Sequence, residues 1–357
     1  MEIGIVGLPN VGKSTLFNAL TGAGIAAENF PFTTIEPNVG IVPLPDERLS
    51  VLAEKWKSAK ITPSGIRFVD IAGLVKGASQ GEGLGNKFLA NIRAVDALCH
   101  VVRCFHDEDV VNVAGDLNPV QAAEIIETEL LLADLQQAQK ALERAHKFAK
   151  SGEKEARERV AALEQIIANF DQGKSARLQD IPGEILSEYQ FLTAKPVLYV
   201  ANCDENGASP DMIGPLKELA AREGAAVIEL CTKLESEILE LPEEERKSYY
   251  DAAGIATPGL GKLARAGCEL LKLACFFTAG PQETRAWLIP QGTPAVKAAG
   301  KIHTDMERGF IRAEVYKYDD LVRLGEYSIL KEQGLVRLEG KEYEILDGDV
   351  LYFRFSV

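Results

Sequence analysis

The first half of the chain alternates short apolar runs with segments of helical periodicity. Each apolar run is bounded by Gly, Pro or Asn, and most are followed by a helical pattern. The runs are Ile3–Val6, Ile66–Val69, Ala97–Val102 and Val197–Ala201. Buried strands that alternate with helices are typical of a parallel sheet with crossover helices. The pattern therefore predicts an α/β fold.

The stretch Pro119–Phe170 departs from that alternation. Apolar residues recur there at spacings of four and three, in two series separated by Ser151-Gly152. The first series is Leu131, Leu135, Ala138, Leu142, Ala145 and Ala149, and the second is Ala156, Val160, Leu163, Ile167 and Phe170. Two heptad-like helices joined by a glycine turn predict an antiparallel helical hairpin. Its charged outer faces are most simply solvated, and binding of a partner is the alternative.

From about Phe277 the chain changes character again. Short β-like runs alternate with Gly, Pro and Asp turns; they are Arg285–Ile289, Phe310–Val315 and Val350–Phe355. This pattern predicts a small, separate β-rich domain. We therefore expect an α/β domain in residues 1–118 and 190–276, a helical hairpin in residues 119–189, and a third domain in residues 277–357.

Composition narrows the choice of partners. The 357 residues are 46% hydrophobic and 26% charged, which suits more than one packed core, and the net charge is -14. So acidic a protein meets nucleic acid or anionic membrane only through a local patch. The third domain is less acidic, with 11 Lys and Arg against 13 Asp and Glu, which weakly favours a contact with RNA.

Other features bear on the compartment. No apolar run reaches the roughly 18 residues of a membrane span, and an apolar strand directly follows Met1-Glu2 in place of a signal peptide. The six cysteines form no CxxC pair, as expected for small core residues in a reducing compartment. We expect a cytoplasmic protein without a membrane or DNA partner.

A phosphate-binding loop follows the first strand. Residues Gly7–Ser14 match GxxxxGK[ST] and precede a helical pattern. The glycines let backbone N–H groups curl around phosphate oxygens, Lys13 would reach the β- and γ-phosphates, and the Ser14 hydroxyl would bind Mg²⁺. The sequence therefore predicts a nucleoside triphosphate site.

Two further segments fit the γ-phosphate side of that site. Asp70 ends the strand Ile66–Val69, where a carboxylate suits the Mg²⁺ side, and the Gly73 N–H would approach the γ-phosphate. Thr34 lies in a loop that could complete the Mg²⁺ shell only when the γ-phosphate is present. Lys13, Asp70 and Gly73 are the predicted catalytic residues. The residue after Gly73 is Leu74, where Ras-type enzymes have a glutamine that orients the attacking water, so we expect low intrinsic turnover.

The predicted base site lies in Asn202–Glu205, after the fourth apolar run. Guanine-specific enzymes carry NKxD there, whereas this chain has Cys203 for the lysine and Glu205 for the aspartate. Both changes weaken discrimination by paired polar groups, so tolerance or preference for adenine follows. The Asn202 amide oxygen can accept from the adenine 6-amine. Residues 231–233, Cys-Thr-Lys, form a weaker motif for a second base loop.

These segments together resemble the YchF/Obg-like ATPase family of P-loop NTPases. The resemblance rests on Gly7–Thr21, Asn29–Asn38, Asp70–Asn86, Asn202–Glu205 and Ala299–Val315, which span nearly the full chain. It implies an OBG-type G domain, an inserted coiled-coil hairpin and a C-terminal TGS domain of β-grasp type. It also implies Mg²⁺-dependent hydrolysis of ATP in preference to GTP, and association with the ribosome, through the large or both subunits, or with rRNA.

The resemblance also implies roles for individual residues. The phosphate-binding residues would be Asn10, Val11, Gly12, Lys13, Ser14 and Thr15. Ser14 and Thr34 would bind Mg²⁺. Asn202 and Cys203 would contact the base, together with Glu205 of the same motif, and Phe105 would lie against the adenine.

This chain departs from some family members at two positions. Thr33 stands where members can carry a redox-active cysteine, which excludes a redox switch through that residue. Asn112 stands where others have a histidine proposed for catalysis, and an amide cannot act as a general base at neutral pH. His106 is nearby, but a lone histidine is more often a surface or packing residue.

The favoured hypothesis is therefore a Mg²⁺-dependent ATPase that tolerates GTP and acts as a switch. An Obg-type GTPase is one alternative, opposed by Cys203 and Glu205. A ribosome- or RNA-binding module with vestigial hydrolysis is the other, supported by Leu74 and by the third domain, in which His303–Asp305 could touch RNA although a structural turn there is the simpler interpretation.

Overall fold

The computed structural model describes residues 1–23, 38–71, 84–107, 117–149, 154–252, 255 and 257–356. The described residues group into two compact units. The first comprises residues 1–23, 38–40 and the described part of 67–263, and the second comprises residues 41–66 and 264–356. Residues 41–66 thus group with the C-terminal part, although the predicted boundaries place them in the first domain. Those domain boundaries stay a prediction.

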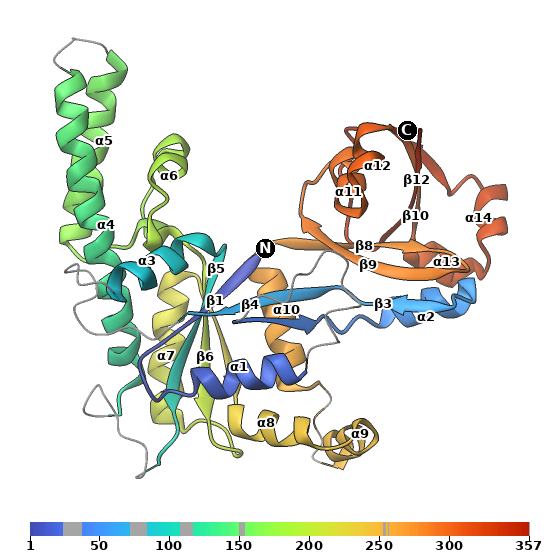
Figure 1. Cartoon of the computed structure of the whole chain (residues 1–357), viewed down its shortest axis with the longest axis horizontal. Helices are drawn as coiled ribbons and strands as arrows, with labels where there is room; N and C mark the ends of the chain where they lie inside the picture. Colours follow the sequence, from blue (N-terminus) through green and yellow to red (C-terminus); the bar gives the residue numbers. More distant parts are fainter. Residues whose placement is uncertain are drawn as a thin grey trace. The chain divides into compact units, whose positions relative to one another are not determined.

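A six-stranded sheet organises the first unit (Figure 1). Its strands run in the order β2 (Val39–Pro43), β4 (Gly65–Asp70), β1 (Glu2–Val6), β5 (Ala97–Cys104), β6 (Val197–Cys203) and β7 (Ala226–Leu230). The pairs from β4 through β7 are all parallel. The predicted parallel α/β sheet is confirmed, and the carboxyl ends of β1, β5, β6 and β7 meet at one edge, where α/β proteins bind ligands.

The helices of this unit alternate with the strands. They are α1 (Lys13–Gly22), α3 (Leu84–Ala94), α4 (Pro119–Ala149), α5 (Lys154–Asp171), α6 (Gly183–Tyr189), α7 (Pro210–Glu223), α8 (Thr232–Glu240), α9 (Glu243–Ala252) and the start of α10 (Gly259–Leu270), with short 3₁₀ turns η3 (Ala176–Leu178) and η4 (Leu192–Ala194). Helix α1 packs against α8, whereas α4 packs against β5 and α7. Every helix in the described ranges is too short or too polar to cross a bilayer.

The long α4 and α5 form the predicted helical hairpin, an arm that extends beyond the sheet of its own unit (Figure 1). Most residues of both heptad series lie at the contact between the two helices, where Ala138, Ala145, Leu163 and Phe170 are buried. The seam also includes Ile166, which the 4,3 spacing missed because it assigned Ile167 instead. The predicted glycine turn lies outside the described residues.

A buried carboxylate fixes the lower part of α4 to the chain that returns from the hairpin. Asp134 is fully buried and accepts three hydrogen bonds from η4: from the Leu192 N–H at 2.8 Å, the Thr193 N–H at 2.8 Å and the Thr193 hydroxyl at 2.7 Å. Burial raises the pKa of Asp134 to about 6, although these hydrogen bonds act in the opposite direction. The carboxylate thus stabilises a turn whose backbone donors would otherwise be unpaired.

A second buried cluster connects the hairpin to the sheet. The Arg177 guanidinium lies 3.0 Å from Glu127 of α4 and 2.8 Å from Glu223 of α7, and Tyr199 of β6 donates its hydroxyl proton to Glu223 at 2.9 Å. Next to Tyr199, the pKa of the His100 ring is lowered to about 3 by burial and by Arg177. His100 is therefore neutral in the folded protein, and the only formal charges in this cluster are those of the arginine and its carboxylates.

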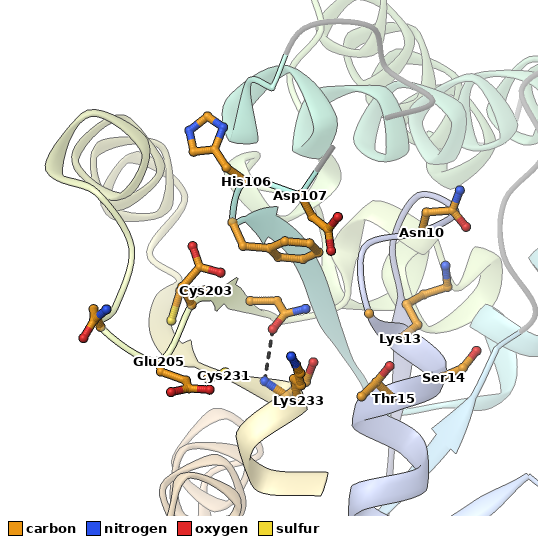
Figure 2. A pocket seen from close by; sticks show the side chains of 16 residues that line it. Asn10, Lys13, Ser14, Thr15, His106, Asp107, Cys203, Glu205, Cys231 and Lys233 are labelled. Carbon is orange, nitrogen blue, oxygen red and sulfur yellow. Dashed lines mark hydrogen bonds between the residues drawn. The ribbon is translucent and has the colours of Figure 1, made fainter. Parts of the chain in front are cut away.

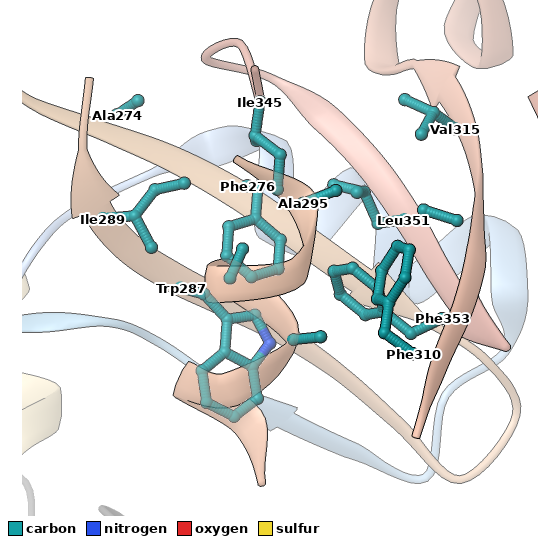
Figure 3. Close-up of a cluster of buried hydrophobic side chains, with 13 residues drawn as sticks. Ala274, Phe276, Trp287, Ile289, Ala295, Phe310, Val315, Ile345, Leu351 and Phe353 are labelled. Carbon is teal, nitrogen blue, oxygen red and sulfur yellow. The ribbon is translucent and has the colours of Figure 1, made fainter. Parts of the chain in front are cut away.

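The second unit is built on its own six-stranded sheet. The strand order is β11 (Arg337–Glu339), β10 (Phe310–Lys317), β12 (Asp349–Phe355), β8 (Leu273–Ala279), β9 (Glu283–Pro290) and β3 (Lys60–Thr62). Helices α11 (Ala295–Ile302) and α12 (Thr304–Arg308) pack on one hydrophobic cluster; α2 (Glu47–Trp56), α13 (Tyr318–Leu324) and α14 (Tyr327–Glu332) pack on another. Figure 3 shows the first cluster, in which Phe276, Trp287, Phe310 and Phe353 supply the aromatic rings. The predicted β-rich domain is confirmed.

The buried Asp134 carboxyl predicts a measurable pH dependence. The pKa of Asp134 is about 6 in the folded protein and near 4 in an unfolded chain. Between pH 4 and pH 6 the carboxyl is therefore protonated in the folded state and ionised in the unfolded state. The stabilisation that comes from this bound proton is therefore present in full below about pH 4 and is lost as the pH rises through 6. Relative to Asp134→Asn, which cannot titrate, the wild-type free energy of unfolding should fall by about 2 kcal/mol between pH 4 and 7 in urea titrations.

The control is Asp171→Asn, which removes one carboxylate from the exposed end of α5. If the free energy of unfolding of the wild type, relative to Asp171→Asn, fell by the same amount between pH 4 and 7, the pH dependence would not come from the burial of Asp134.

Candidate nucleotide-binding site

A cavity of about 760 Å³ lies at the carboxyl edge of the first sheet. It is bounded by the loop after β1 and by the loops after β5, β6 and β7. The lining residues are Asn10, Gly12, Lys13, Ser14, Thr15, Phe105, His106, Asp107, Asn202, Cys203, Asp204, Glu205, Asn206, Cys231, Thr232 and Lys233. Figure 2 shows Asn10, Lys13, Ser14 and Thr15 on one side and Cys203, Glu205 and Cys231 on the other. The cavity has the size of a small-molecule site and brings together the predicted phosphate loop and both predicted base loops.

Close approaches require glycine at both ends of the phosphate loop. Gly12 has φ +97°, and a Cβ there would lie 2.2 Å from the Asn202 Nδ2 atom. Gly7 has φ +153°, and a Cβ there would lie 2.5 Å from the Val101 carbonyl oxygen of β5. Any side chain at either position would displace the loop from its neighbours. The spacing of the motif thus follows from the packing of the loop against β5 and β6.

Lys13 and Asp70 form an electrostatic pair behind the loop. Lys13 is 9% exposed, and its ammonium group donates to the Leu8 carbonyl oxygen at 2.6 Å. Burial lowers the pKa of Lys13, and the Asp70 carboxylate opposes that shift. Burial likewise raises the pKa of Asp70, opposed by Lys13. Each charge is partly desolvated and is stabilised by the other, so either would gain from a further ion of opposite sign.

Oxygen donors at this end suit a magnesium ion. Ser14 has an exposed side chain that lines the cavity, and the desolvated Asp70 carboxylate ends β4. The described residues contain no cluster of three or more His, Cys, Asp or Glu side chains arranged for a metal. Mg²⁺ keeps several waters and is bound through few protein oxygens together with phosphates. The other predicted residues of this region, Thr34 and Gly73, lie outside the described residues, as do Thr33, Leu74 and Asn112.

Asn202 connects the phosphate loop to the second base loop. The side chain is 4% exposed; its Nδ2 donates to the Val11 carbonyl oxygen at 2.9 Å, and its Oδ1 accepts from the Thr232 N–H at 3.1 Å. Both functions of the amide are thus bound to backbone groups within the protein. This geometry gives Asn202 a positioning function, in addition to the contact with the base that the sequence predicts.

The neighbouring residues give the base end of the cavity its chemistry. Cys203 is 6% exposed, and burial raises the pKa of its thiol to about 11, so it is a neutral, weakly polar group. Glu205 and Lys233 are exposed and line the cavity, and Cys231 is partly exposed beside them. Residues 231–233 therefore belong to the same cavity, as the weaker sequence motif suggested.

Comparison with known proteins identifies the family. Residues 2–202 match the family described as 50S ribosome-binding GTPase, and residues 273–356 match the YchF-GTPase C-terminal family, described as a protein of unknown function. A Pasteurella multocida protein named Ribosome-binding ATPase YchF is 51% identical over 100% of this chain and 99% of its own. A Bacillus subtilis protein of the same name is 49% identical over 100% of both chains. This chain belongs to the YchF family.

Solved structures agree with this assignment. The Schizosaccharomyces pombe YchF GTPase is 34% identical and superposes with a TM-score of 0.88 over 99% of this chain and 97% of that one. A GTP-binding protein from Pyrococcus horikoshii, 20% identical over 100% of both chains, has a TM-score of 0.62 and shows the likeness of fold alone. The P-loop G domain with a helical insert and the YchF-type C-terminal β domain, both expected from the resemblance, are confirmed.

The loop after β5 contributes residues to this YchF-family cavity that the motifs did not single out. The Arg103 side chain is buried and donates to the Phe105 carbonyl oxygen at 3.2 Å and to the Asp107 carbonyl oxygen at 2.8 Å. Its guanidinium carbon lies 4.6 Å from the Phe105 ring centroid, a cation–π contact. Arg103 therefore positions Phe105 at the cavity. In the sequence, an arginine inside an apolar strand was the feature that could have indicated such a function. His106 lines the cavity with an exposed side chain, which is consistent with the surface residue that the sequence favoured.

Substituting Asn202 separates positioning from base recognition. Asn202→Ala removes two hydrogen bonds between loops, worth about 0.5–1.5 kcal/mol each, so we expect ATP and GTP affinities to fall together by about tenfold or more. Equilibrium titration with fluorescent analogues of both nucleotides measures the two affinities. Asn206→Ala, on the same cavity with an exposed side chain, is the matched control. A changed ratio of ATP to GTP affinity in Asn202→Ala would assign Asn202 to base recognition instead.

Proposed function

We propose that this protein is a Mg²⁺-dependent ATPase that hydrolyses ATP in preference to GTP and acts as a ribosome-associated switch. The observation that carries the proposal is the chemistry of the cavity: a phosphate loop at one end and, at the other, Cys203 and Glu205. Its relatives named Ribosome-binding ATPase YchF cover the full chain at about half identity, which supports the ribosome as partner. A ribosomal partner also supports a cytoplasmic location.

The base end supports adenine. Guanine-specific G domains place a lysine stem over the ring and an aspartate on the guanine N1–H and amine. Here a buried neutral thiol takes the place of the lysine, and the longer Glu205 is exposed. A site built to hydrogen-bond guanine excludes adenine because its own polar groups would be left unpaired. A site without such groups has no comparable barrier to adenine. Phe105, positioned by Arg103, offers an apolar ring to either purine.

The phosphate end supports phosphoryl transfer. Lys13 donates to a neutral carbonyl oxygen, and a phosphate oxygen is the stronger acceptor for its ammonium group. We therefore infer that Lys13 transfers its hydrogen bond to the β- and γ-phosphates. Ser14 and Thr34 would hold Mg²⁺, with Asp70 on the same side and the Gly73 N–H near the γ-phosphate. The bound Mg²⁺ would neutralise charge on the phosphate oxygens, as in other P-loop enzymes.

A GTPase is the second candidate. It is favoured by the 50S ribosome-binding GTPase family that matches residues 2–202, and by the S. pombe relative named as a GTPase. The two hypotheses share every residue of the phosphate end and differ only at the base end. The deciding comparison is therefore between nucleotides on the same protein.

The first experiment is hydrolysis of ATP and GTP side by side, with and without ribosomes from a matched source. We expect faster hydrolysis of ATP and stimulation by ribosomes. Lys13→Ala serves as the control that removes tight nucleotide binding. Faster hydrolysis of GTP would favour the GTPase, and no turnover of either nucleotide, even with ribosomes, would favour a binding module.

The base end itself can be tested by restoring the guanine-specific pattern. Cys203→Lys combined with Glu205→Asp should shift the ratio of kcat/KM values toward GTP by about tenfold or more, because a carboxylate at the shorter reach can pair the guanine edge. Cys231→Ser, on the same cavity but outside the NxxE motif, is the control. If the double variant left the ratio unchanged, residues Asn202–Glu205 would not be the base site.

A further inference from the structure

The helical hairpin is strongly polarised in charge along its length. We define its tip as residues 140–148 of α4 and 154–159 of α5, and its base as residues 119–139 and 160–171. The tip carries six Lys and Arg residues and three Glu residues. The base carries no Lys or Arg at all; its acidic residues are Glu124, Glu127, Glu129, Asp134, Glu164 and Asp171. Every lysine and arginine in these two helices thus lies in the distal part of the arm.

Three of the six acidic residues of the base are buried or paired within the protein. Asp134 is fully buried against η4, Glu127 pairs with Arg177, and Glu129 is 8% exposed. The other three, Glu124, Glu164 and Asp171, are exposed. In the tip, Lys154 pairs with Glu158 and Arg159 with Glu188, and the other four cations have no ion pair within the described residues.

The cations of the tip face solvent. Lys140, Arg144, Lys147 and Arg157 are all exposed, and within the described part of the chain none of them forms an ion pair. Lys140, Arg144 and Lys147 follow each other at spacings of four and three, so they share one face of α4. The seam residues Ala138, Ala141 and Ala145 lie on another face of that helix. Lys140 and Lys147 therefore point away from α5, whereas Arg144 borders the groove between the hairpin and α6.

We propose that this outer face of the hairpin tip binds the phosphate backbone of ribosomal RNA. The inference rests on the proposed association with the ribosome. A net charge of -14 repels RNA from the molecule as a whole, so a contact with RNA requires a local cationic surface, and the tip is one. Phe148, the residue after Lys147, is 73% exposed, and an aromatic ring there can stack on an unpaired base.

The groove beside the tip is not the contact. A cavity of about 590 Å³ lies between the tip and α6, and Figure 1 shows α6 beside the hairpin. Four carboxylates, Glu155, Glu158, Glu184 and Glu188, line it, and Glu188 already pairs with Arg159 at 2.7 Å. Arg144 and Phe148 also border this groove, whereas Lys140, Lys147 and Arg157 do not line it. Negative charge in the groove disfavours phosphate, which leaves the face that carries these three cations as the contact surface.

The test reverses three cations that have no ion-pair partner among the described residues: Lys140→Glu, Lys147→Glu and Arg157→Glu in one chain. We expect binding of protein-free ribosomal RNA, measured by filter binding, to weaken at least tenfold at 0.1 M salt. The slope of log affinity against log salt should fall by about two, because each lost phosphate contact removes about 0.7–0.9. Co-sedimentation with ribosomes should weaken in parallel, whereas ATP hydrolysis without ribosomes should stay at the wild-type rate.

The matched control makes the same change in net charge elsewhere in the first unit. Arg222→Glu, Lys247→Glu and Lys262→Glu reverse exposed cations of α7, α9 and α10, and should change RNA affinity less than threefold. Phe148→Ala should weaken binding about fivefold or more without changing the salt slope, because stacking is not a charge contact. Circular dichroism verifies the helix content, and the neutral triple Lys140→Gln, Lys147→Gln and Arg157→Gln replaces the reversed one if that fails to fold.

The outcomes distinguish this inference from the proposed function. Wild-type RNA affinity and salt slope in the triple variant would overturn the inference and leave the ATPase proposal intact. Loss of ribosome binding with unchanged binding of protein-free RNA would assign the tip to a ribosomal protein and would overturn the RNA contact. If the wild type bound RNA through the tip but did not sediment with ribosomes, the ribosome-associated function would fail while the RNA-binding surface stood.

Discussion

The candidate site depends on a single amide side chain. Asn202 at the end of β6 donates to Val11 in the phosphate loop and accepts from Thr232 at the start of α8, so it joins segments 191 and 30 positions away in the sequence. Because Asn202 Nδ2 lies where a Cβ of residue 12 would be, the phosphate loop can approach it only with glycine there. Gly12 of the phosphate loop and Asn202 of the base motif thus require each other, because the close approach of one needs the other. This explains why the cavity has a fixed separation between its phosphate end and its base end.

The sequence predicts those parts of the molecule that are specified locally. The phosphate loop, the strands and the hairpin follow from motifs and periodicities contained within short windows, and all were confirmed in outline. What the sequence could not supply is long-range. Strand β3 has only three residues, and it pairs with β9, more than 200 positions away, so nothing in its own residues indicates its sheet. The positioning function of Arg103 likewise depends on contacts with backbone atoms that fold past it.

Side-chain contacts at the base of the hairpin attach α4 to the G domain. A helical insertion attached only by its two ends would pivot, but α4 is held along its lower half. Asp134 binds η4, and Glu127 shares Arg177 with Glu223 of α7. Glu223 in turn bonds Tyr199, in the same strand that ends at Asn202 and Cys203. The desolvation of Arg177 is offset by two carboxylates, so removing Arg177 would leave Glu127 and Glu223 without their cation. The cluster therefore couples the position of α4 to the strand that carries the base-site residues.

The same arrangement makes an acidic protein compatible with an RNA contact. Along α4, Lys147 of the tip lies thirteen positions after the buried Asp134, a rise of about 20 Å at 1.5 Å per residue. The Debye length at physiological ionic strength is about 8 Å, so the Asp134 carboxylate is screened at Lys147 by more than two such lengths. Glu164 of α5, in contrast, lies beside His146 of the tip. A cationic patch on the surface of the sheet domain would lie within the field of that domain's acidic residues. A patch at the end of a rigid helical arm acts on a phosphate backbone largely by itself, so the length of the hairpin and the polarity of its charges serve the same contact.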